Sequence, residues 1–305
     1  MPYLQPYKIF NEEHTRVNQL YWMSKYSYQR MESLLGMLSS TGHVEPDPRV
    51  DRLWPSTDAG ESNHITVKLS DFSGFLANSA GRLRTVSILF QCSAFETALE
   101  QYYTLCGIYR PGAISSPAPY DSVPELLNDR AKYEAAKRWA GGKARDNLRG
   151  KYSGRVSTLY STFGLPMPAT LQTTDLDLHY SVRHQIAHNQ GLSSIEGPDV
   201  PAIAILQSRV DLSEDSWKAM MGAFHCAIHA IDRSIKKSLV VDLGLPLAVY
   251  HITERDGPVT LGALQFKVAG EFGLQPTHRE VLDAAIAIGR TTKKNGESIS
   301  KVLVA

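Results

Sequence analysis

The spacing of apolar and polar residues predicts that this chain is mainly α-helical. Apolar side chains recur at intervals of three and four residues, which is the period of one face of an α-helix. The pattern predicts helices at residues 11–40, 69–109, 124–160, 173–190 and 216–238. Amphipathic helices of this kind bury their apolar faces against one another. We therefore expect a helical bundle.

Three of these helices differ in character. Residues 82–105 carry a broad apolar face, which predicts a helix at the centre of the bundle. The helix at 124–160 is the densest cationic stretch of the chain, and Gly141-Gly142 is expected to interrupt it. The helix at 216–238 has a regular core stripe, formed by Trp217, Met221, Phe224, Ile228, Ile231 and Ile235.

Breaks in the helical pattern define a first predicted domain, residues 1–243. Its core lies at about residues 69–239, and the helix at 11–40 packs on that core. Residues 41–63 are rich in Pro, Gly, Asp and Ser, which predicts a loop. Residues 200–212 have a β-like composition and predict a short extended segment.

The remaining residues, 244–305, predict a small C-terminal module that is helical or winged-helix-like. Two short helices are expected around residues 273–277, followed by a turn at 293–296 that would suit a wing. This pattern is compatible with a DNA-binding helix-turn-helix module or with a simple docking appendage.

Composition narrows the class of protein. Among 305 residues, 43% are hydrophobic and 21% are charged, which is typical of a chain that buries a core. The net charge of +1 means that any nucleic-acid site must be a local patch. The three cysteines form no CxxC pair, and the N-terminus has no signal-peptide pattern. No apolar run is long enough to cross a membrane. We expect a cytoplasmic protein with no membrane partner.

The helix that precedes Gly191 carries the most distinctive chemistry. On a wheel of 100° per residue, Leu178, Val182 and Ile186 fall within about 80° and form the expected core stripe. The opposite arc, roughly 140° wide, holds the cationic and titratable side chains. Its members are Tyr180, Arg183, His184, Ala187 and His188. The small Ala187 lies in the middle of this arc, where it allows another surface to approach closely.

The run Arg183-His184-Gln185-Ile186-Ala187-His188 resembles the R-x(4–6)-H motif of HEPN domains, including the polar residue after the arginine. The letters RHQIAHNQG are similar to the RN-x-IAH-x-G form of that motif. HEPN domains also share the order of long apolar helix, motif helix, short extended segment and closing helix. The resemblance covers about residues 69–239 and is strongest at residues 183–191.

The resemblance implies a metal-independent endoribonuclease that needs no cofactor and forms a homodimer through the motif helix. Such proteins act as toxins or as antiviral (abortive infection) effectors, so RNA and an antitoxin or other defence protein are the implied partners. The alternative is a non-catalytic HEPN module that binds RNA or protein.

The residue types of the motif suit RNA cleavage. Histidine has an unperturbed pKa of about 6.5 and can act as acid or base near neutrality. Arginine is always charged and presents a planar fork to phosphate oxygens. We assign His188 as general acid/base, Arg183 as phosphate or transition-state binder, and His184 as a positioning group. Asn189 and Tyr180 are expected to support them.

Glu96 and Glu100 lie one helical turn apart beside the central apolar face. We interpret this carboxylate pair as a solvated edge, with the alternative that one of them positions Arg183. The cationic helix at 124–160 is the best candidate for phosphate contacts, although such a run is more often a solvated face. The candidate RNA-binding residues are Arg138, Lys143, Arg145, Arg149, Lys151 and Arg155.

A competing interpretation is a metal site. The pairs His184–His188 and His225–His229 both have the i,i+4 spacing of helical zinc ligands, and Cys226 adjoins the second pair. Both pairs lack the glutamate of the HExxH motif, so a zinc protease is not expected. No phosphate-binding loop, GxSxG or GxGxxG motif lies between a strand and a helix. We predict no metal ligand at the motif, with a structural or hydrolytic histidine-rich site as the alternative.

Overall fold

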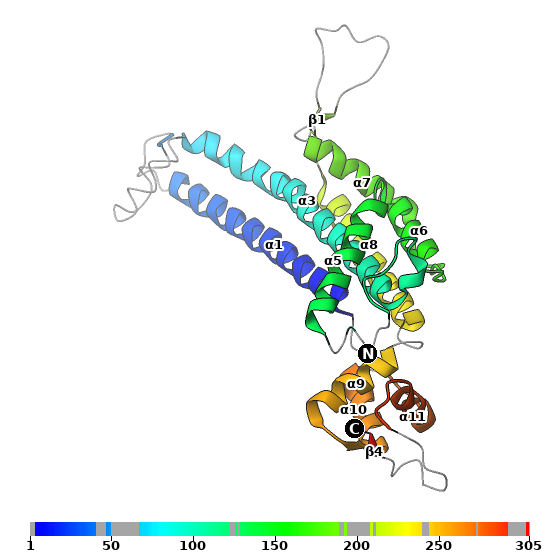
Figure 1. Cartoon of the computed structure of the whole chain (residues 1–305). Coiled ribbons are helices and arrows are strands. Elements are labelled where there is room, and N and C mark those ends of the chain that lie inside the picture. The colour runs from blue at the N-terminus through cyan, green and yellow to red at the C-terminus, as the bar shows by residue number, and fades with distance from the viewer. Residues whose placement is uncertain are drawn as a thin grey trace, which may run out of the picture. The chain divides into compact units, whose positions relative to one another are not determined.

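The computed structural model describes residues 4–40, 47–49, 67–121, 126, 129–188, 192–193, 208–209, 212–239, 244–272, 274–291 and 303–304. Over these residues the fold is mainly α-helical, as the sequence pattern predicts (Figure 1). In chain order the elements are α1 (Gln5–Ser40), α3 (Leu69–Tyr109), the short 3₁₀ helix η3 (Pro111–Ala113), α5 (Arg130–Asn147), α6 (Tyr152–Thr162), α7 (Thr173–His188), β1 (Leu192–Ser193), β2 (Ser208–Arg209), α8 (Glu214–Leu239), α9 (Leu245–Asp256), β3 (Val259–Thr260), α10 (Leu261–Phe272), α11 (His278–Ala287) and β4 (Leu303–Val304).

The chain divides into two compact units. The first contains Met1–Phe10, Phe95–Asp177 and His225–Ala305, and the second contains Asn11–Ala94 and Leu178–Phe224. Within the described residues, no helix combines the length and the apolar character that crossing a membrane requires.

In the second unit, α1, α3 and α8 meet around Trp217, whose side chain is 1% exposed. The Trp217 indole N–H donates to Ser87 Oγ at 2.6 Å, so the polar atom of this buried ring is satisfied. The ring of Tyr21 lies 4.2 Å from that of Trp217. Tyr21 also donates to Glu214, the first residue of α8, at 3.1 Å. The contacts of Tyr21 thus join α1 to the start of α8.

All six residues of the core stripe predicted for residues 216–238 are buried, from Trp217 to Ile235. An apolar stripe of this regularity leaves one orientation for the helix, because any rotation would expose several large side chains. The prediction for α8 is therefore confirmed.

In the first unit, α3 and α5 approach closely at Gly107. A Cβ atom at Gly107 would lie 3.1 Å from Ala140 Cβ and 2.9 Å from Ile114 Cδ1, so no larger residue fits there without a shift. Ala136, Ala140, Ile108, Leu126 and Tyr120 form the buried cluster around this contact. The Tyr120 hydroxyl donates to the Ile108 carbonyl at 2.7 Å.

The predicted interruption at Gly141-Gly142 is wrong. Helix α5 runs unbroken through both glycines, and the chain breaks instead between Asn147 and Tyr152. Gly150 lies in that break with φ of 82°, a left-handed conformation that glycine adopts without steric cost. Two glycines cost a helix only about 1 kcal/mol each, and the packing of α5 outweighs this cost.

Within the extended segment predicted at residues 200–212, the structure describes Ser208, Arg209 and Leu212. Ser208–Arg209 form β2, which pairs antiparallel with β1. The loop predicted at 41–63 lies outside the described residues except for 47–49.

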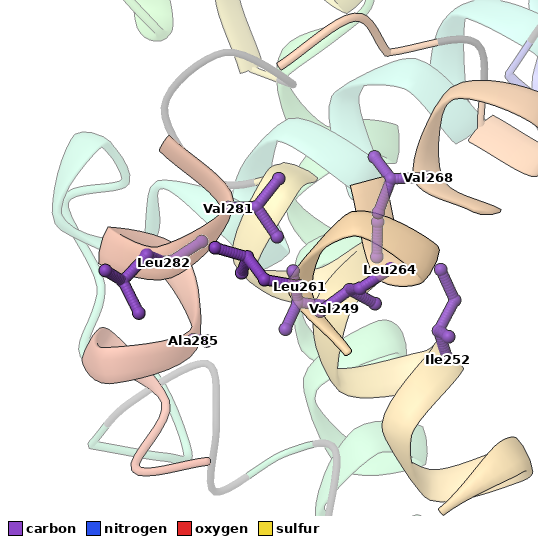
Figure 2. Close-up of a cluster of buried hydrophobic side chains, with 10 residues drawn as sticks. Val249, Ile252, Leu261, Leu264, Val268, Val281, Leu282 and Ala285 are labelled. Carbon is purple, nitrogen blue, oxygen red and sulfur yellow. The ribbon is translucent and has the colours of Figure 1, made fainter. Parts of the chain in front are cut away.

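The C-terminal helices α9, α10 and α11 pack around an apolar cluster of their own (Figure 2). Val249, Leu261, Leu264 and Val268 are buried between the helices, and Val281 closes the cluster from α11. Strand β3 follows α9 and pairs antiparallel with β4. Three helices and one two-stranded pair are thus described in the C-terminal module, which is helical as the sequence predicts. The turn predicted at 293–296 lies outside the described residues.

Candidate functional site

Helix α7 begins at Thr173, where the sequence offers capping residues, and runs through His188. Asp177, in its second turn, accepts hydrogen bonds from the backbone N–H and the hydroxyl of Ser153 at 2.9 and 2.6 Å. These bonds tie α7 to the first turn of α6, whose N-terminal N–H groups have no partner within the helix. The start of the motif helix is thereby fixed.

The buried side of α7 differs from the prediction. Leu176, His179 and Ile186 are 1%, 6% and 7% exposed, whereas Leu178 is 64% exposed. The predicted stripe of Leu178, Val182 and Ile186 is therefore wrong at Leu178 and correct at Ile186, and Val182 is half-buried. The His179 ring packs 5.3 Å from the ring of Phe224 on α8. An aromatic contact thus holds this side of α7 against the core of its unit.

The observed orientation of α7 changes the expected position of Arg183. At 100° per residue, Arg183 falls between Leu176 and His179 rather than opposite the core. Its side chain is half-buried. Arg183 therefore lies on the packed side of α7, which corrects the expectation that it points away from the core.

The remaining described motif residues lie toward solvent. His184 and Ala187 are exposed and Tyr180 is half-buried. The rings of Tyr180 and His184 are stacked, with centroids 6.3 Å apart and planes inclined by 25°. The side chain of His188 and all of Asn189 lie outside the described residues.

The candidate RNA-binding residues divide into two groups. Arg138, Arg145, Arg149 and Lys151 are exposed and Lys143 is half-buried, so these five basic side chains of the α5–α6 region reach solvent to differing extents. Within it, Arg149 donates to Asp146 at 3.2 Å, an exposed pair of little energetic weight.

Arg155 belongs to a different environment. It pairs with Glu96 at 3.6 Å, and its side chain is only 14% exposed. Glu96 also accepts from the Tyr152 hydroxyl at 3.0 Å. Glu96 thus anchors α6 to α3, so neither the solvated-edge interpretation nor the positioning of Arg183 describes its main contacts.

A pocket of about 930 Å³ lies in the first unit, on the outer side of α8. It is lined by Tyr7, Pro166, Met167, Pro168, Thr170, His225, Cys226, His229, Ala230, Arg233 and Ser234. The Tyr7 hydroxyl lies 3.2 Å from His225 Nε2. Burial and the neighbouring His229 both lower the pKa of His225. The sequence signal for this pocket was the i,i+4 histidine pair, but Tyr7 and residues 166–170 come from distant parts of the chain.

One acidic side chain of α8 is deeply buried. Asp232 is 1% exposed and accepts from the Tyr102 hydroxyl at 2.9 Å and from the Leu4 backbone N–H at 3.1 Å. Burial raises the pKa of Asp232, whereas the two hydrogen bonds favour the ionised form and lower it. The effect of burial is the larger, so the pKa is raised. Asp232 links α8 to α3 and to the chain just before α1.

The described residues contain no group of three or more His, Cys, Asp or Glu side chains arranged to hold a metal ion. In the C-terminal module, the exposed side of α11 carries Arg279 together with Glu280 and Asp283. Glu280 is engaged in the capping box with Thr277, and Arg279 lies 4.0 Å from Asp283. A helix that enters a DNA groove needs positive charge toward phosphates, and this surface has more acid than base.

Comparisons with models of known protein families, with curated proteins and with solved structures find no match to this chain.

Proposed function

We propose that this chain is a metal-independent endoribonuclease of the HEPN type that acts through the last turns of α7. The observation that carries the proposal is the joint position of Arg183 and the Tyr180–His184 stack. A half-buried arginine is followed by an exposed histidine whose ring stacks on that of Tyr180 near the helix end. This supplies a fixed positive charge and a titratable group that a phosphodiester can reach.

In the proposed reaction a histidine removes the proton of the RNA 2′-hydroxyl. The 2′-oxygen then forms a bond to phosphorus, and the bond from phosphorus to the 5′-oxygen breaks. A second protonated histidine donates a proton to that 5′-oxygen. The products are a 2′,3′-cyclic phosphate and a 5′-hydroxyl, and Arg183 offsets the negative charge that develops on the phosphorane oxygens.

Helix geometry favours a site shared by two chains. Arg183 and His188 are five residues apart, which separates them by about 140° around the helix axis. One helix therefore directs these side chains to different sides, whereas two α7 helices related by a two-fold axis can direct an arginine and a histidine to one phosphate. The exposed Ala187 between them would allow that approach. RNA and a second copy of the chain are the proposed partners.

The half-burial of Arg183 also favours a second candidate function. An arginine on the packed side of a helix can serve structure and charge without catalysis. The alternative is therefore a non-catalytic RNA- or protein-binding module of the same family.

Cleavage of total RNA by the purified chain discriminates the two functions. Arg183→Ala and His188→Ala should each reduce cleavage by about 100-fold or more, since each removes a group needed in the transition state. Arg279→Ala and His278→Ala replace exposed residues of the same types in the C-terminal module and should leave cleavage unchanged. Equal inactivity of wild type and all variants, with RNA still bound, would favour the binding module.

The same assay tests the metal-independent reaction. Activity should survive excess EDTA, and RNA with a 2′-deoxy nucleotide at the cleaved position should resist. The pH–rate curve should be bell-shaped and centred within about one unit of 6.5, the pKa of a free histidine. Loss of activity with EDTA and recovery with zinc would falsify this mechanism.

A further inference from the structure

One wall of the pocket on the outer side of α8 carries two histidines and an arginine. His225, His229 and Arg233 follow one another at intervals of four residues, so they line one side of the helix over two turns. None of the lining residues is an aspartate or a glutamate. Arg233 is exposed, and no carboxylate among the described residues forms an ion pair with it. The pocket therefore offers a charge that an anion can neutralise.

A second, apolar part of the pocket lining is fastened to α8. Pro166, Met167 and Pro168 form it, and the Ser234 hydroxyl donates to the Pro166 carbonyl at 3.0 Å, which fastens this segment to α8. The Leu171 N–H donates to the Pro168 carbonyl at 3.0 Å and closes the turn. Two prolines and these bonds reduce the conformational freedom that a ligand would otherwise have to restrict.

Tyr7 closes the pocket from the first turn of α1. Its ring meets the rings of His225 and His229 edge to face, with centroids 6.1 and 6.0 Å away. Tyr7 is 6% exposed, so its ring position is set by packing. The volume of about 930 Å³ suits a small organic molecule and exceeds what an inorganic anion would fill.

We propose that this pocket binds a small phosphate monoester with a flat apolar body, of the class of nucleoside monophosphates. The phosphate lies against Arg233 and His229, where a planar guanidinium fork can bond two phosphate oxygens. The flat body lies between the Pro166–Pro168 segment and the Tyr7 ring. The proposal does not rest on ribonuclease activity, because it uses none of the residues of α7.

Calorimetric titration of the full chain with AMP, adenosine, ribose 5-phosphate and inorganic phosphate tests both walls. AMP should bind more tightly than the other three, because only AMP engages the cationic and the apolar wall together. Arg233→Gln should weaken AMP binding by about tenfold or more, as expected for loss of a charge-assisted contact, and leave adenosine binding unchanged. Met167→Ala should weaken AMP and adenosine but not phosphate.

Arg279→Gln is the matched control, because it removes another exposed arginine, which lies in the C-terminal module. It should leave all four titrations unchanged. Circular dichroism establishes that each variant keeps its helices. Undetectable AMP binding at millimolar concentration, or equal AMP binding by wild type and Arg233→Gln, would overturn the proposal. Equal affinity for AMP and inorganic phosphate would also overturn it, since the apolar wall would then contribute nothing.

Discussion

Helices α7 and α8 each carry two histidines four residues apart, yet the surroundings of these histidines differ between the two helices. In α8, His225 and His229 are half-buried, and both line a pocket together with Tyr7. In α7, His184 is exposed and contacts Tyr180 of its own helix. A spacing of four residues therefore does not by itself decide the surroundings of a helix face. The neighbouring segments decide whether that face lines a pocket or meets solvent.

The difference originates in the core-facing sides of the two helices. The six apolar residues of the α8 stripe are all buried. In α7, the apolar residues Leu176, Leu178 and Ile186 do not share one face, and the buried side includes the polar His179. A stripe that contains histidine predicts the buried face of a helix only weakly, because histidine is intermediate among residues in its tendency to be buried.

The largest effect should come from an alanine-to-tryptophan change on the outer side of α7. If α7 forms the proposed two-fold interface, Ala187→Trp should block close approach and halve the mass measured by light scattering, from two chains to one. Ala230→Trp is the matched change on α8, where the new ring fills the pocket, and it should leave the mass unchanged. A wild-type mass of one chain at micromolar concentration would rule out the interface.

A pair of leucines two positions apart on α7 tests its observed phase. Leu176→Ala should lower the free energy of unfolding by about 2–5 kcal/mol, because Leu176 is buried. Leu178→Ala should change it by no more than about 0.5 kcal/mol, since that side chain is largely exposed. Urea unfolding of the two variants measures both values. The reverse order would restore the stripe predicted from sequence.

The smallest effect concerns the pH dependence of α8. The pKa of Asp232 is raised in the folded protein relative to about 3.9 in the unfolded chain. The folded state then binds more protons in the window above pH 3.9, so the Asp232 contribution to stability is full below that pH and is lost as pH rises through the folded pKa.

Asp232→Asn should remove this pH dependence. It keeps an oxygen that accepts from Tyr102 and Leu4, and it removes the buried charge. The stability of the variant relative to wild type should therefore increase between about pH 4 and neutrality. Urea unfolding across this range gives the comparison. A constant difference would show that Asp232 titrates normally.

The sequence by itself determined the mainly α-helical class, the position of most helices and the orientation of α8. The helical class and the helix positions depend on the local periodicity of apolar residues. The orientation of α8 depends on its stripe of six large apolar residues, which are all buried in only one rotation of the helix. Helix α7 likewise begins at Thr173, where the sequence offers capping residues.

Only the tertiary structure decided the phase of α7, the role of Glu96 and the existence of the pocket. Leu178 and Leu176 are equally apolar, and the contact of His179 with Phe224 selects which one is buried. Glu96 meets Arg155, and Tyr7 meets His225, across 59 and 218 positions of sequence. Contacts at such separations depend on how helices pack in three dimensions, which periodicity within one helix does not encode.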